Sequence, residues 1–375
     1  MVKNNNTRLD PWSVKEVKNY SLIMKEFGID DIDTVAARIP SPNKYIRRKI
    51  NFGHIDLGTV LDAVEKNEPY AVMSGIKPTG SFHLGSKITA EELIFFQQLS
   101  SKAVVFYCIA DYEAYADNRM SFADSLEIAV ENVADLLALG LNPERAFIYR
   151  QSDDKRLLDM AFTFTRDVTY NMMEAIYGDK SFGLYISALI QVADILLPQT
   201  KDFDGPKPTV VPVGVDQAPH IRLTRDIARK YQKEYGFLLP SAVFHKLIRS
   251  LKGTFKMSKR EPMGILTLND DPETAKKKIL EAFTGGRDTV SLQRRLGGEP
   301  EKCTIYELLM YHFVDDDNAV KTRYEKCIAG ENLCGDCKAY VADFVANYLR
   351  KHQKRRRSHI DTAREILKTN TIHHS

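Results

Sequence analysis

The sequence is poor in cysteine, in net charge and in long apolar runs. Five cysteines in 375 residues are too few, and odd in number, for the disulfide framework of a secreted domain. No apolar run is long enough to cross a membrane, and residues 1–6 lack the apolar stretch of a signal peptide. A net charge of only +3 means that a nucleic-acid partner would need a local basic face. We therefore expect a cytoplasmic protein with reduced thiols and no membrane partner.

Two common motifs are missing or incomplete. The chain has no Gly-x-x-x-x-Gly-Lys-Ser/Thr loop, so the usual phosphate-binding loop of nucleotide enzymes is absent. Cys334 and Cys337 form one Cys-x-x-Cys with Cys327 upstream, but a second such pair or a nearby His pair is lacking. Cys303 could join them only through the fold. We therefore expect no metal site and interpret these residues as reduced cysteines near a helix start.

The pattern of apolar residues predicts three parts. Residues 1–69 form an N-terminal appendage that holds the single tryptophan, Trp12, and a helix over Tyr20–Phe27 ended by Gly28. Residues 70–265 alternate short apolar runs with helical stretches, which predicts an α/β fold with a parallel sheet covered by helices on both faces. The expected strands are Tyr70–Ser74, Ala103–Ala110, Ala146–Arg150 and Thr209–Val213. Ligands of such sheets bind at the carboxyl ends of the strands.

Residues 266–375 are predicted to be helical throughout. Helical spacing is found in Ala275–Phe283, Ile305–Phe313, Ala319–Ile328 and Tyr340–His352. The last of these leads into a basic run, Lys351–Arg357. Such a run is typical of a solvated helix face, and phosphate contact is the alternative.

The stretch Phe82–Ser86 is the first candidate for chemistry. It lies between a predicted strand and a predicted helix, where backbone N–H groups and the helix dipole attract an anion. Gly85 would let a ligand approach the backbone, and His83 could donate to a phosphate oxygen. Taken alone, the stretch fits a buried histidine in a glycine-containing turn better than a phosphate site.

Two further stretches add to it. Lys256–Arg260 offers ammonium groups and a hydroxyl on a loop bounded by Gly253 and Pro262, although by itself it also fits a basic surface loop. Val211–Asp226 is a strand, a glycine turn and a helix. Within it, Asp216 could accept from ribose hydroxyls, and Gln217 could both donate to and accept from a zwitterion.

Together these stretches resemble the HIGH and KMSKS signatures of class I aminoacyl-tRNA synthetases. From Asp10 to about Arg357 the chain is similar to the tryptophanyl-tRNA synthetases of archaea and eukaryotes, with further matches at Val168–Asn171, Ala282–Thr289 and Phe313–Asp317. The resemblance implies a Rossmann-like catalytic domain and a helical anticodon-binding domain. It also implies ATP and Mg²⁺, L-tryptophan activated to tryptophanyl-adenylate, transfer to tRNA(Trp) with release of AMP and pyrophosphate, and a homodimer.

The resemblance assigns roles residue by residue. The residues that match catalytic positions of the family are His83, Lys256, Ser258 and Lys259. The residues that match ATP-binding positions of the family are Ser74, Gly75, His83, Gly85, Ser86, Gly214, Val215, Asp216, Lys256, Met257 and Ser258. The tryptophan-binding group comprises Met73, Cys108, Glu113, Gln191 and Gln217, with Glu174 as a candidate. The basic residues Lys354, Arg355, Arg356 and Arg357 are candidate tRNA contacts.

The chain departs from the family signatures at four positions. Ser86 replaces the second His of HIGH, and Arg260 replaces the last Ser of KMSKS. Met73 and Cys108 stand where the eukaryotic enzymes read the indole N–H with a Tyr and a Gln, which leaves Glu174 as the candidate reader.

Three other functions stay open at this point. They are a tyrosyl enzyme, a nucleotidyltransferase that uses no tRNA, and an inactive tRNA-binding paralogue. Pyrophosphate exchange with each amino acid would separate them.

Overall fold

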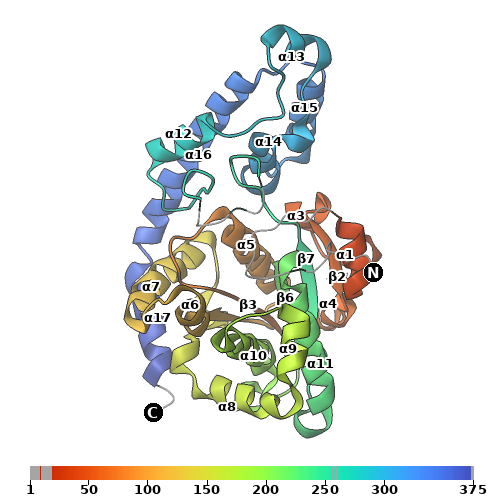
Figure 1. Cartoon of the computed structure of the whole chain (residues 1–375), viewed down its shortest axis with the longest axis vertical. Coiled ribbons are helices and arrows are strands. Elements are labelled where there is room, and N and C mark those ends of the chain that lie inside the picture. The colour runs from red at the N-terminus through yellow and green to blue at the C-terminus, as the bar shows by residue number, and fades with distance from the viewer. Residues whose placement is uncertain (1–8, 10–18, 255–256, 258–260, 373–375) are drawn as a thin grey trace.

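A seven-stranded sheet in the order β1-β2-β7-β6-β3-β4-β5 forms the centre of the molecule, with helices on both faces (Figure 1). The computed structural model describes residues 9, 19–254, 257 and 261–372, so the predictions for Trp12, Lys256, Ser258, Lys259 and Arg260 lie outside the described residues. Strands β3 to β7 run parallel, whereas β2 is antiparallel to β7 and β1 to β2. The predicted α/β fold class is confirmed.

All four predicted strands are present, and the sequence missed three more. The predicted strands are β3 (Tyr70–Ile76), β4 (Ala103–Ile109), β5 (Ala146–Arg150) and β6 (Thr209–Gly214). The others are β1 (Asp30–Asp31), β2 (Asn51–Ile55) and β7 (Ser241–His245). Strands β2 and β7 were not predicted because a histidine interrupts the apolar pattern of each. A hydrogen bond to another side chain offsets the cost of burying that histidine. His54 lies 2.9 Å from Thr34 Oγ1, and His245 lies 2.9 Å from Glu92 Oε2.

Residues 30–55 of the predicted appendage therefore extend the sheet rather than stand apart from it. Strand β2 pairs with β7, and α4 (Leu57–Lys66) packs against β7 in the core that contains Val243. The predicted boundary between residues 69 and 70 falls within one continuous sheet. The division of the chain into domains 1–69, 70–265 and 266–375 stays a prediction.

Two sets of helices cover the sheet. One core contains residues of α4, α5 (Leu84–Gln98) and α7 (Phe122–Leu139). The predicted limits of α7 are confirmed, because Ser121 Oγ accepts from the Asp124 N–H at 3.1 Å and Gly140 ends the helix with a φ of 113°. The opposite core contains residues of α1 (Tyr20–Phe27), α8 (Lys155–Phe164), α10 (Phe182–Leu196) and α11 (Ala218–Tyr235). Helix α6 (Asp111–Asn118) contacts α10 and α7, and α9 (Tyr170–Tyr177) adds Met173 and Tyr177 to the second core.

Helix α10 is long and apolar enough to be mistaken for a membrane span. The stretch Phe182–Gln199 has a mean hydropathy of 1.4, yet 78% of it is buried inside the molecule. Its residues pack between the sheet and the helices on this face. It is therefore the core helix of a folded domain.

The described chain beyond residue 270 is helical, as predicted. It contains α12 (Pro272–Leu280), α13 (Val290–Leu296), α14 (Thr304–Leu308) with a π-helical turn at Leu309–Phe313, α15 (Asp317–Ile328), α16 (Cys334–Arg357) and α17 (Ile360–Ile372). Helices α16 and α17 run back along α7 (Figure 1). His352 on α16 lies 2.7 Å from Asp135 Oδ1 on α7, and both side chains are fully buried. The last two helices therefore pack against the helices that cover the sheet.

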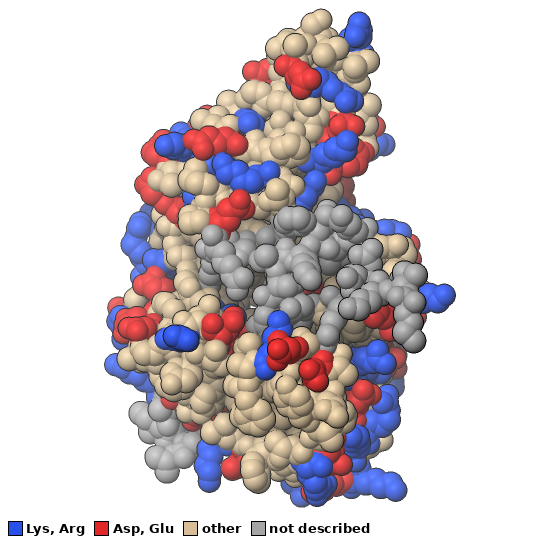
Figure 2. Space-filling view, in the orientation of Figure 1, with Lys and Arg blue, Asp and Glu red and all other residues tan. Residues whose placement is uncertain are grey.

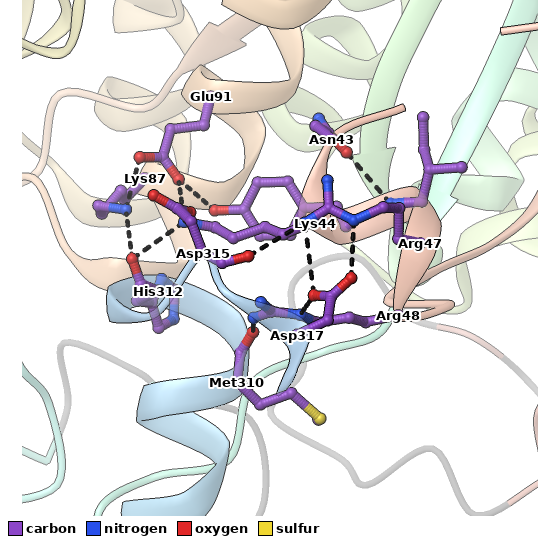
Figure 3. Close-up of polar contacts among 12 residues, drawn as sticks. Asn43, Lys44, Arg47, Arg48, Lys87, Glu91, Met310, His312, Asp315 and Asp317 are labelled. Carbon is purple, nitrogen blue, oxygen red and sulfur yellow. Dashed lines mark hydrogen bonds and ion pairs between the residues drawn. The ribbon is translucent and has the colours of Figure 1, made fainter. Parts of the chain in front are cut away.

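Charged residues of the N-terminal segment hold the helical region in place. Helix α3 (Lys44–Arg47) and Arg48 face the segment that follows the π-helical turn (Figure 3). Lys44 Nζ donates to Asp315 Oδ1 at 3.0 Å, and Arg48 Nε donates to Asp317 Oδ1 at 2.7 Å. Because these partners are more than 260 residues apart in sequence, only the folded chain brings them together.

Candidate active site

A cavity of about 380 Å³ opens at the carboxyl ends of β3, β4 and β6. This size and position are typical of ligand sites in parallel sheets. A second recess of about 240 Å³ adjoins it and shares part of its lining. The larger cavity is lined by the predicted residues Met73, Ser74, Gly75, His83, Ser86, Cys108, Glu113, Gln191, Gly214, Gln217 and Met257. The recess adds Gly85 and Asp216.

The predicted turn at His83 begins helix α5. His83 Nδ1 accepts from the Ser86 N–H at 3.3 Å, so the ring caps the helix and its neutral form carries the proton on Nε2. A Cβ at position 85 would lie 2.9 Å from the His83 ring, so Gly85 is needed where the ring folds back. This geometry presents a ring N–H and a helix N-terminus to the cavity.

Two other glycines allow close packing around the recess. A Cβ on Gly75 would lie 2.4 Å from Cys108 Sγ, and one on Gly214 would lie 2.6 Å from Asp216 Oδ1. Asp216 is buried and lines the recess next to Gly214. The Val215 side chain, by contrast, packs in the core, so only its backbone is left to meet a ligand.

The other end of the cavity holds a buried carboxyl group. Asp194, on α10, accepts from the Tyr149 hydroxyl at 2.9 Å and from Gln151 Nε2 at 2.6 Å. Burial raises the pKa of Asp194 to about 7, although hydrogen bonds from Gln151, Tyr149 and Cys108 favour the ionised form. Met73 and Cys108 line the cavity beside it. The arrangement combines an apolar slot with one strong acceptor.

Polar groups suited to an amino acid lie near the same end. Gln191 Nε2 donates to Gln217 Oε1 at 3.4 Å, so α10 and the turn after β6 present their amides together. Glu113 lies 3.1 Å from Lys77 Nζ, which also contacts Asp117 at 2.6 Å. Burial alone would lower the pKa of Lys77, but these two carboxylates outweigh it and the pKa is raised. Carboxylate and amide groups of this kind can hold an ammonium and a carboxylate.

Comparison with known proteins decides the family. Residues 65–350 match the model of the class I tRNA synthetases for tryptophan and tyrosine. The tryptophan–tRNA ligase of Methanocaldococcus jannaschii is 39% identical over 96% of this chain and 98% of its own length. That of Hyperthermus butylicus is 42% identical over 93% of this chain and 94% of its own. The chain is a class I tRNA synthetase of this family.

Solved structures agree with the family assignment. The tryptophanyl-tRNA synthetase of Aeropyrum pernix superposes on this class I synthetase with a TM-score of 0.88 at 38% identity, covering 96% of this chain and 98% of that one. The enzyme of Plasmodium falciparum gives 0.82 at 28% identity, with coverages of 93% and 96%.

Some predicted residues lie away from the synthetase's cavity. Glu174 is exposed on α9 and is not among the lining residues, so it is not placed to accept from a buried indole. Arg356, predicted to contact tRNA, lies 2.7 Å from Glu131 on α7 and its side chain is only 17% exposed. This pair joins two helices, so Arg356 has a structural partner. Lys354, Arg355 and Arg357 are exposed.

Sequence reasoning missed the most unusual group of the synthetase's site. Asp194 is the only acidic residue of α10, and the residues around it are apolar. An acid within such a buried helix requires a partner or a function. A single acid within an apolar helix was therefore the signal by which the sequence could have revealed Asp194. Tyr149 and Gln151 gave no signal in the sequence, because they donate to Asp194 only where β5 ends beside α10.

Proposed function

We propose that this chain is a tryptophan–tRNA ligase, which activates L-tryptophan with ATP and transfers it to tRNA(Trp). The observation that carries the proposal is the buried Asp194 carboxyl at the end of an apolar slot lined by Met73 and Cys108. The names of the archaeal relatives support the same substrate.

Asp194 replaces Glu174 as the proposed acceptor of the indole N–H. The indole is mostly apolar with one donor, and the slot offers apolar walls with one strong acceptor. Glu113, Gln191 and Gln217 then hold the ammonium and carboxylate of the same amino acid. A tyrosine hydroxyl could also reach Asp194, but its shorter ring would leave part of the slot unfilled.

ATP is proposed to lie over Gly75, Gly85 and Gly214. The cavity and its adjoining recess share Gly75 and Gly214, Gly85 lines the recess beside them, and Asp216 lies where it could accept from ribose hydroxyls. His83 Nε2 and the N-terminus of α5 would donate to phosphate oxygens. Among the described residues, no three His, Cys, Asp or Glu side chains are arranged to hold a metal ion. This fits Mg²⁺ bound through the triphosphate, which supplies charge neutralisation.

Adenylate formation needs positioning more than proton transfer. The tryptophan carboxylate attacks the α-phosphorus and pyrophosphate leaves, so the protein must hold the two groups in line and stabilise negative charge. His83 and the α5 N-terminus are suited to this task, together with the predicted Lys256, Ser258 and Lys259.

We also propose a homodimer that acts in the cytoplasm. Support for the dimer comes from exposed apolar side chains on α8, α9 and α10, where Figure 2 shows a largely uncharged surface. They are Leu158, Phe162, Tyr170, Met172, Phe182 and Ile186.

Pyrophosphate exchange with a panel of amino acids tests the function. We expect exchange with tryptophan, and exchange with tyrosine weaker by roughly 10- to 200-fold, which corresponds to the ~1–3 kcal/mol that unfilled volume in an apolar pocket costs. Charging of tRNA(Trp) should follow. Equal exchange with tyrosine would contradict the specificity, exchange without charging would favour a tRNA-free enzyme, and no exchange would favour an inactive paralogue.

The exposed basic residues at the end of α16 give a separate prediction. Replacing Lys354, Arg355 and Arg357 with Gln should weaken tRNA binding and reduce its dependence on salt, because each lost phosphate contact lowers the number of released counterions. Pyrophosphate exchange should not change. The control replaces Arg222, Arg229 and Lys233, exposed on α11, and so removes the same charge elsewhere. An equal effect of both triple variants would mean that only net charge matters.

A further inference from the structure

A buried pair of ionisable residues, Glu92 and His245, adjoins the recess proposed for ATP. His245 is the last residue of β7, lines the recess, and is only 5% exposed. Its Nδ1 lies 2.9 Å from Oε2 of Glu92, a fully buried residue of α5. The pair therefore links a strand of the sheet to the helix that begins at His83.

Glu92 continues the side of α5 that borders the recess. Ser86 and Thr89 line the recess, and Glu92 follows three residues after Thr89, about one turn further along the same side of the helix. A fully buried acid requires a partner or a function. Glu92 is not itself a lining residue of the recess, so it acts on the recess through the ring of His245.

The protonation of this pair decides what the ring offers to the recess. Burial raises the pKa of Glu92, and the charge of His245 opposes this rise. A buried carboxylate without a cation is costly. Glu92 is therefore either ionised beside an imidazolium, or protonated and donating to Nδ1 of a neutral ring. In both cases the other ring nitrogen, Nε2, carries a hydrogen and is a donor.

Nε2 of His245 and the carboxylate of Asp216 border the same backbone position. Gly214 and His245 are register partners on β6 and β7. A Cβ on Gly214 would lie 3.4 Å from His245 Nε2 and 2.6 Å from Asp216 Oδ1. Glycine leaves this space open. One donor and one acceptor thus lie within reach of a single small group in the recess.

We propose that His245 Nε2 donates to a ribose hydroxyl oxygen of ATP, and that Glu92 is the positioning residue that orients the ring and keeps the hydrogen on Nε2. The inference rests on the proposed ATP site and extends it. A ribose has two neighbouring hydroxyl groups that both donate and accept, so a carboxylate and a ring N–H side by side complement it. A phosphate oxygen would be repelled by the adjacent Asp216 carboxylate, which favours the uncharged sugar as the group bound here.

Equilibrium titration of the wild-type protein with α,β-methylene-ATP and Mg²⁺ is the primary test, because this nucleotide is not cleaved at the reacting bond. Its 2′-deoxy and 3′-deoxy counterparts are titrated in parallel. We expect at least one of them to bind about 5- to 150-fold more weakly, the effect of leaving a buried polar group without its partner. Equal binding of all three nucleotides would overturn this inference while leaving the proposed function standing. Binding of none of them would overturn both.

The His245→Ala variant then identifies the donor. It should weaken binding of α,β-methylene-ATP by about 5- to 150-fold but change the Kd of one deoxy counterpart less than about twofold, because the hydroxyl that His245 contacts is already missing there. Pyrophosphate exchange should show the same loss in the KM for ATP, with a smaller change in kcat. An equal loss for all three nucleotides would mean that His245 does not read the ribose.

Matched variants separate ribose recognition from folding. His54→Ala is the control, because it removes a buried histidine of the neighbouring strand β2 that does not line the recess, and it should leave the three Kd values unchanged. Glu92→Leu should lose the same ribose preference as His245→Ala, although the ring is still present. Glu92→Gln can still donate to Nδ1 and should retain the preference. A Glu92→Leu variant with the full wild-type preference would overturn the positioning role of Glu92.

Discussion

Lys256→Ala should lower the rate of adenylate formation by about 10²- to 10³-fold, as does the loss of one group that stabilises transition-state charge in other enzymes. The expectation follows from a reaction in which negative charge is neutralised and little proton transfer occurs. Met257, the next residue, is buried and lines both parts of the cavity, which connects this signature to the site. The KM for tryptophan should barely change, because the ammonium group acts on the triphosphate.

Single-turnover measurement of adenylate formation checks this expectation. Lys252→Ala is the control, since it removes the same charge from an exposed position immediately before Gly253, where the loop begins. Near-normal activation by the Lys256 variant, or an equal defect in both, would remove Lys256 from the catalytic group. His83→Ala offers a second comparison, because it removes both the helix cap and the ring N–H that faces the cavity.

Asp194→Asn should lower kcat/KM for tryptophan by about 10- to 150-fold, which corresponds to the ~1.5–3 kcal/mol of a hydrogen bond to a charged group. The loss should be small for an N-methylated indole analogue, which has no N–H to donate. Glu174→Gln is the control. Because that side chain is exposed on α9, its substitution should change kcat/KM for tryptophan less than twofold. Equal losses for tryptophan and for the analogue would mean that Asp194 supports the pocket without reading the indole.

The same carboxyl group predicts a pH dependence. Because burial raises the pKa of Asp194 to about 7, the stronger, ionised acceptor is present above that pH, and the KM for tryptophan should fall as pH rises through it. The effect on folding has the opposite sign. A carboxyl whose pKa is raised in the folded state contributes stability below its unfolded pKa, and this contribution is lost as pH rises to about 7. Asp194→Asn should therefore flatten the KM profile without lowering the melting temperature at pH 8.

The sequence predicted the parts of the fold that have regular patterns. The apolar runs of β3 and β4 and the caps of α7 were visible because strand burial and helix capping leave local signals. Strand β7 gave no such signal, because its buried His245 is compensated by Glu92, which lies 153 residues earlier. Partners supplied by distant segments cannot be found from local spacing.

The candidate site likewise contains residues that local motifs predicted and residues that only the fold brings together. His83, Gly85, Gly214 and Gln217 lie on short motifs, and the structure gathers them at one cavity. The contacts of Asp194 with Tyr149 and Gln151 depend on how α10 meets the end of β5. The pairing of Arg356 with Glu131 on α7 was not foreseen, because a basic run does not reveal which side chain faces a neighbouring helix.

The pairing of β2 with β7 also affects how the protein folds during its synthesis. Asn51 and His245 are register partners that lie 194 residues apart. At the usual ~5–20 residues per second, the ribosome needs on the order of 10 to 40 s to deliver β7 after β2 has emerged. Throughout that interval Phe52 and an open strand edge of the N-terminal segment are without their native cover. The nascent chain is therefore most exposed to misfolding and to chaperone capture through this early segment.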